Sequence, residues 1–74
     1  MLTVKIVRQT ADGRCMSIQP AIEVFEQAEG SICVTTSARP GAEHTICHDV
    51  SDGQTAIFVE NAAGKTVQRF GRLT

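Results

Sequence analysis

Five glycines recur along this chain at nearly even intervals, and we interpret each as part of a tight turn. The segments between them are short and rich in Ile, Val, Thr, Phe and Cys, most of which favour β-strands. Turns that separate short β-prone segments at regular spacing predict an antiparallel all-β domain. The turn signals are Asp12-Gly13, Glu29-Gly30, Pro40-Gly41, Asp52-Gly53 and Ala63-Gly64.

The length of 74 residues suits a single domain, which we expect to span residues 1–74. We predict a small antiparallel meander of five to six strands that forms a compact barrel or sandwich. A domain of this size buries only about 60% of the surface that its unfolded chain exposes, so its core is thin. Such domains often gain stability from disulfides, a metal or self-association.

The N-terminal third predicts a β-hairpin. Leu2, Val4 and Ile6 alternate with polar residues, and a period of two indicates a half-buried strand. After the first glycine turn, the second strand should cover residues 14–19, with Met16 and Ile18 directed toward the core.

The segment over residues 20–29 has two interpretations. Pro20 suits the first turn of a helix that Gly30 would end, whereas Ile22 and Val24 alternate with Glu23 as in a strand. We favour the strand because neighbouring strands usually pair, and we keep one short helical turn near 20–29 as the alternative.

The middle of the chain constrains the strand register. If Ile32 and Val34 share the core face with Ile46, then Cys33 and Cys47 share the opposite face, and an opposed register brings them close.

Residues 54–61 and 66–70 form the clearest hairpin, with Val59 set against Val67. The loop over residues 61–65 suits a type I turn followed by a left-handed glycine. The tail over residues 71–74 should be frayed unless a partner holds it.

Composition excludes several classes of protein. Seven basic and eight acidic residues give a net charge of −1, which argues against strong nonspecific binding of nucleic acid. No apolar run approaches the ~20 residues of a membrane span, so we expect no membrane partner. The odd count of three cysteines suits reduced thiols, and we predict a cytoplasmic protein.

The densest group of metal-ligating residues lies in the segment over residues 44–49. Cys33, His44, Cys47 and His48 could form a zinc set, which makes a small Cys/His metal-binding protein one alternative function. Spacing by four brings two histidines together on a helix but not on a strand. We therefore expect exposed histidines beside buried cysteines, and no metal or cofactor.

The same residues could pair as a thiol nucleophile and its base, but such a pair also needs an orienting group and a substrate cleft. We interpret the cysteines as small hydrophobic side chains and predict no enzymatic activity. A disulfide between Cys33 and Cys47 under oxidation stays open as an alternative, and its geometry is demanding.

Basic charge and one aromatic ring gather near the C-terminus at Lys65, Arg69, Phe70 and Arg72. A basic groove with a stacking ring is typical of small β-barrels that bind single-stranded nucleic acid, the other alternative function. We favour a solvated strand face and name these four residues as the candidate binding surface.

Unpaired sheet edges favour a different role. An open sheet leaves two edges that can pair with another chain. We therefore predict a small noncatalytic interaction or regulatory module that binds a protein partner or itself, as a homodimer, through a sheet edge or the C-terminal hairpin. The hairpin over residues 56–70 resembles those of small bacterial and phage-borne proteins, which implies such an origin.

Overall fold

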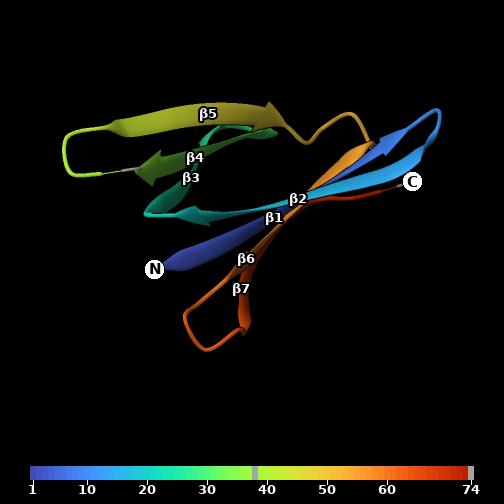
Figure 1. The fold of residues 1–74 in the computed structure, drawn as a ribbon. Coiled ribbons are helices and arrows are strands. Elements are labelled where there is room, and N and C mark those ends of the chain that lie inside the picture. The colour runs from blue at the N-terminus through green and yellow to red at the C-terminus, as the bar shows by residue number, and fades with distance from the viewer. Residues whose placement is uncertain (38, 74) are drawn as a thin grey trace.

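The structure is a computed structural model that describes residues 1–37 and 39–73, and its described part contains seven strands and no helix (Figure 1). The all-β antiparallel class is confirmed, with seven strands in place of five or six. The strands are β1 (Leu2–Thr10), β2 (Gly13–Ala21), β3 (Glu23–Ala28), β4 (Ser31–Ser37), β5 (Glu43–Asp49), β6 (Thr55–Glu60) and β7 (Thr66–Gly71).

The strands form two separate sheets, a sandwich in place of a barrel. The four-stranded sheet has the order β2-β1-β6-β7, and the three-stranded sheet has the order β3-β4-β5. All five strand pairs are antiparallel. The chain departs from a simple meander because β1 pairs with β6, a strand about 50 residues further along the sequence.

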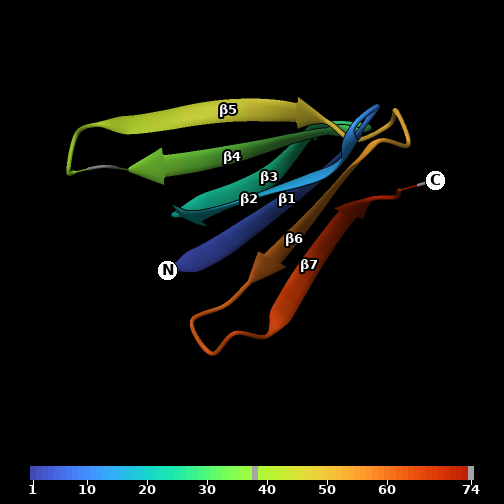
Figure 2. The ribbon, with the colours of Figure 1, turned by 45° about the vertical axis from the view of Figure 1, so that its right-hand side comes forward.

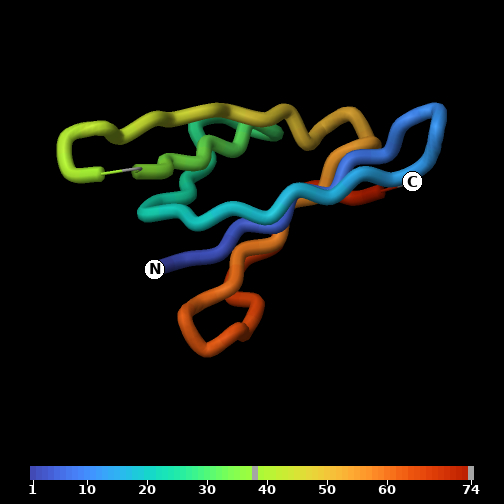
Figure 3. The backbone as a smooth tube through the Cα atoms, in the orientation of Figure 1, coloured from blue at the N-terminus to red at the C-terminus, as the bar shows by residue number. Residues whose placement is uncertain are grey.

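The chain passes between the sheets twice, as the tube in Figure 3 shows. It crosses first at Ile22, whose backbone N–H donates to the carbonyl of Thr35 at 2.9 Å. It returns through residues 50–54, where the N–H of Val50 donates to the carbonyl of Gly30 at 2.8 Å. The sheets lie close near this return and diverge toward the β4–β5 and β6–β7 turns (Figures 1 and 2).

The core lies between the facing sides of the two sheets. Val4 and Ile6 on β1 meet Ile32 and Val34 on β4, and all four are buried. The predicted alternation in β1 is therefore confirmed. The remaining members of the buried cluster are Ala21, Val50, Ile57 and Val59, with Leu2, Val24 and Phe70 packed against it.

The second strand has the opposite orientation from the one predicted. Met16 pairs with Val7 and Ile18 pairs with Lys5, so both side chains lie on the side of the sheet turned away from the core. They are 60% and 59% exposed. The prediction was wrong because β2 is an edge strand whose inner side carries polar residues.

The ambiguous segment over residues 20–29 holds the end of β2, a bend at Ile22, strand β3 (Glu23–Ala28) and a turn that begins at Glu29. The favoured strand is therefore confirmed, and the helical turn was wrong. Pro20 belongs to the end of β2 and does not begin β3. As an edge strand, β2 tolerates a residue that has no backbone N–H to donate.

All five predicted turn glycines adopt positive φ, in the range 73° to 126°. In the β6–β7 loop, the N–H of Gly64 donates to the carbonyl of Asn61 at 3.0 Å, as the predicted turn requires. The register beyond this loop differs from the prediction. Glu60 pairs with Thr66 and Val59 with Gln68, so an irregularity leaves Val67 without the predicted partner.

The C-terminal tail was predicted to be frayed from residue 71 onward. Gly71 is the last residue of β7 and pairs with Ala56, so the prediction was wrong there. Thr74 lies outside the described residues. Nowhere in the described ranges does a helix occur that could cross a membrane.

Candidate binding surfaces

The four residues of the predicted basic surface do not converge. Arg69 pairs with Phe58 and lies on the outer side of the four-stranded sheet. Phe70 pairs with the buried Ile57, and its partly buried ring packs against the core on the inner side of the sheet. Lys65 and Arg72 flank β7, which separates their backbones by about 23 Å at 3.3 Å per residue.

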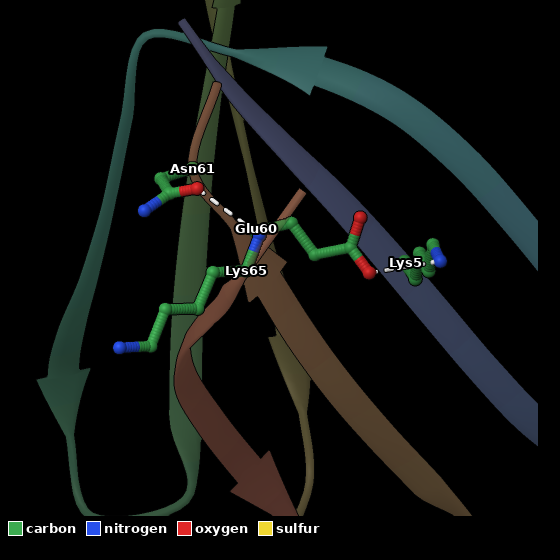
Figure 4. Close-up of polar contacts among 4 residues, drawn as sticks. All are labelled: Lys5, Glu60, Asn61 and Lys65. Atoms are coloured by element: carbon green, nitrogen blue, oxygen red, sulfur yellow. Dashed lines mark hydrogen bonds and ion pairs between the residues drawn. The ribbon is translucent and has the colours of Figure 1, made fainter. Parts of the chain in front are cut away.

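Figure 4 shows where Lys65 lies relative to the nearest ion pair. Its N–H donates to Asn61 Oδ1 at 3.0 Å, which fixes the loop, and its side chain extends away from Glu60. Lys5 Nζ lies 2.9 Å from Glu60 Oε2. Because both partners are partly exposed, this pair contributes at most about 1 kcal/mol.

The outer side of the four-stranded sheet combines apolar side chains with basic ones, and we call it the basic face. Across the sheet, Met16 on β2 pairs with Val7 on β1. In the next row, Lys5 on β1 lies between Ile18 on β2 and Phe58 on β6. We define the basic face by Lys5, Val7, Arg14, Met16, Ile18, Phe58 and Arg69. Glu60 lies on the same side of the sheet and is paired with Lys5.

The cations of the basic face are held against the sheet. The Arg69 guanidinium lies over the Phe58 ring at 6.0 Å from its centroid, within the range of a cation–π interaction. Arg14 Nε donates to Gln9 Oε1 at 2.9 Å. Among the described residues, neither arginine has an acidic partner, so both keep their charge available to a ligand.

The outer side of the three-stranded sheet is acidic. Glu23 lies on β3, and Glu43 and Asp49 lie on β5, all on the side turned away from the core. Phe25 is 39% exposed and pairs with Cys33, which in turn pairs with Cys47. We call Glu23, Phe25, Glu43, Cys47 and Asp49 the acidic face.

The net charge of −1 conceals a division of charge between the two sheets. Residues 1–21 and 52–74, which form the four-stranded sheet and its turns, hold six basic and three acidic residues. Residues 22–51, which form the three-stranded sheet and its connections, hold one basic and five acidic residues. The two layers therefore carry formal charges of +3 and −4.

The two central cysteines form a disulfide. The predicted opposed register of Cys33 and Cys47 is confirmed, and the two residues are bonded to each other. The expectation of reduced thiols was wrong for this pair, whereas Cys15 is free and exposed. The pairing removes both sulfurs from the proposed zinc set. The described residues hold no group of three or more His, Cys, Asp or Glu that could bind a metal ion.

A hollow of about 200 Å³ opens between β1, β2 and β5. The Nε2 atom of His48 is buried there and makes no hydrogen bond with any described residue. Burial lowers the pKa of His48, and the nearby positive charge of Arg8 lowers it further. The hollow is lined by Ile6, Arg8, Cys15, Met16, Ser17 and His48.

The hollow does not hold an assembled thiol nucleophile. Activation of a thiol by histidine requires the two groups to be in hydrogen-bond contact. Within the described residues, no hydrogen bond joins Cys15 to His48. Cys15 also lies on the core side of its sheet, whereas the disulfide lies on the outer side of the other sheet, so the thiol does not face the bond it could exchange with.

The exposed apolar residues of the basic face were not predicted, and the reason lies in the alternation of the strands. Met16 and Ile18 were assigned to the core because apolar alternation marks a two-sided strand without showing which side is covered. Phe58 was not among the residues of the predicted candidate surface. The charge pattern along the sequence was the signal that could have located the acidic sheet, since residues 22–51 hold five of the eight acids.

The chain matches no protein-family model, no curated protein and no solved structure.

Proposed function

We propose that this protein is a small noncatalytic interaction module that associates with further copies of itself, and that the basic face is its binding surface. The observation that carries the proposal is the exposure of Met16 and Ile18 on one side of an edge strand, at 60% and 59%. They lie two residues apart on the same side and continue across the sheet into Val7 and Phe58.

Three features support binding in place of catalysis. The exposed apolar side chains lie on a regular sheet, which presents a nearly rigid surface to a partner. Two arginines at this surface give it polar recognition, as is common at protein interfaces. Among the described residues, no hydrogen bond joins the Cys15 and His48 side chains that could do chemistry.

The test is the solution mass of the protein and of two matched variants. Met16→Thr/Ile18→Thr should reduce self-association at least tenfold, because each apolar side chain contributes about 1.5 kcal/mol or more when it is buried. Threonine keeps the β propensity of the strand. Ile22→Thr is the control, since Ile22 is 50% exposed but lies in the link between the sheets.

Sedimentation equilibrium at several concentrations would measure these masses. A wild-type protein that stays a single chain at every concentration would reject the proposal, as would equal weakening by the double variant and the control.

A second candidate function is the binding of single-stranded nucleic acid, favoured by Arg69 over Phe58 and by the +3 charge of this layer. Base stacking would then involve Phe58 and not Phe70. Binding of a labelled oligonucleotide that weakens steeply with salt would support it, and no binding at low salt would remove it.

We also propose the cytoplasmic location expected from the sequence. The disulfide provides its test, because cytosolic reductants keep most thiols reduced. A cytoplasmic protein should therefore hold Cys33 and Cys47, which are bonded in the structure, as two thiols in the cell. Thiol labelling of intact cells that finds this pair oxidised would place the protein elsewhere.

A further inference from the structure

The geometry points to a head-to-tail mode of self-association, in which the basic face of one copy packs on the acidic face of the next. This inference rests on the proposed function and specifies the partner of the basic face. Both faces are the outer sides of their sheets, and the sheets form the two layers of the molecule, so the faces point in opposite directions (Figure 1). One copy can therefore contact two neighbours at once.

The two faces are complementary in charge. The basic face presents Arg14 and Arg69, neither of which has an acidic partner among the described residues. The acidic face presents Glu23, Glu43 and Asp49. Hydrogen bonds from the Ser51 hydroxyl and N–H lower the pKa of Asp49, which keeps its carboxylate ionised. Opposite charges on facing surfaces favour this arrangement and fix its orientation.

The same charges disfavour the symmetric alternatives. A two-fold dimer that joins two basic faces would bring the arginines of both copies into one interface. A dimer of two acidic faces would do the same with carboxylates. Like charges in an interface suppress the wrong pairing, so head-to-tail packing is the arrangement with least repulsion.

The apolar parts of the two faces also correspond. Met16 and Ile18 stand beside the cations of one face, and Phe25 stands beside the Cys33–Cys47 disulfide between the acids of the other. Each face thus offers an apolar centre with charged surroundings, the common anatomy of a protein interface.

A contact between two different surfaces extends without limit unless its rotation closes a ring. The expected species is therefore a series of increasing length and not a single dimer.

The test uses two variants that each block one face. Ile18→Glu places an acid on the basic face, and Phe25→Lys places a cation on the acidic face. Both side chains are exposed, and Met16→Glu with Glu23→Lys provides a second pair. Each variant alone should sediment as a single chain. Their equimolar mixture should form a species of twice the 7.9 kDa chain mass that grows no further, because each variant keeps one intact face.

The outcomes separate this inference from the proposed function. Wild-type assemblies that shorten between about 0.01 M and about 1 M salt, as the screening length falls from about 30 Å to about 3 Å, support head-to-tail packing. If Phe25→Lys keeps the wild-type mass, the inference fails while self-association through the basic face stands. If folded variants of both pairs do not combine, head-to-tail packing is overturned. A wild-type protein that binds single-stranded DNA but never self-associates overturns both.

Discussion

At the scale of single residues, Gly71 has less room for a side chain than Gly13, Gly30, Gly41 or Gly64. Its φ is +76°, and a Cβ atom built there would lie 2.8 Å from Val50 Cβ and would also contact the carbonyl oxygen of Thr55. Only glycine avoids both the backbone strain and the steric clash. This residue therefore closes the end of β7 against the chain that returns from the other sheet.

Gly71→Ala should destabilise the fold more than Gly41→Ala. Gly41 has φ of +81° but open space around its missing Cβ, so alanine there costs only the left-handed strain of about 1 kcal/mol. At Gly71 the clash adds about 1–3 kcal/mol. Urea unfolding measures the difference in stability between the two variants. Equal midpoints would show that the segment over residues 50–54 shifts to accommodate the new methyl group without cost.

His48 should make stability depend on pH. The pKa of His48 in the folded protein lies below its ordinary value of 6.5. Above pH 6.5, His48 is therefore neutral in both the folded and the unfolded chain, and it causes no loss of stability. As the pH falls, the unfolded chain takes up the proton first, and stability is lost as the pH passes through the lowered folded value.

The measurement compares urea midpoints of wild type and His48→Gln from pH 8 down to pH 5. The wild type should lose stability over this range and the variant should lose less. Arg8→Gln should also reduce the slope, because Arg8 is the second cause of the lowered pKa. Parallel curves for all three proteins would contradict this account. The lowered pKa of Asp49 acts at lower pH and does not overlap this window.

At the scale of elements, the disulfide ties β4 to β5 across a separation of 14 residues. Closing a loop of this length stabilises a fold by about 3 kcal/mol. Reduction should therefore lower the free energy of unfolding of the wild type by about 3 kcal/mol, which is measured as a lower urea midpoint. Cys33→Ala/Cys47→Ala should unfold at the reduced midpoint whether or not reductant is present, and Cys15→Ser should behave as wild type. An unchanged wild-type midpoint on reduction would show that β4 and β5 need no covalent link.

The strands were predictable because local signals decide them. The turn glycines marked their boundaries, and the alternation in β1 gave its buried side correctly. The parity of Ile32, Val34 and Ile46 even placed the two cysteines opposite each other.

The parts that sequence could not supply are properties of pairing. Nothing local in residues 14–19 shows that β2 lies at an edge with its polar side inward, and so Met16 and Ile18 were assigned to the core. Nothing in β1 or β6 alone shows that they pair. The candidate surface shows the same limit, because only the register shows that Phe70 points inward and Phe58 outward.

At the scale of the whole molecule, net charge was a poor guide to the surface. A net charge of −1 weighs against an electrostatic partner only when acidic and basic residues are mixed over the surface, whereas this fold separates them by layer. A molecule with one basic and one acidic layer has a large dipole. Its association should therefore respond to salt far more strongly than its net charge suggests.

The pairing of β1 with β6 has a consequence for how the chain is made. β1 lies between β2 and β6 in its sheet. β6 follows β1 in the sequence only after all three strands of the other sheet. During synthesis, the first hairpin, which ends at Ala21, therefore keeps one side of β1 unpaired until about 40 more residues, through the end of β6 at Glu60, have emerged from the ribosome. Through that interval the nascent hairpin offers its open backbone to any extended peptide nearby, and shielding by a chaperone would matter most then.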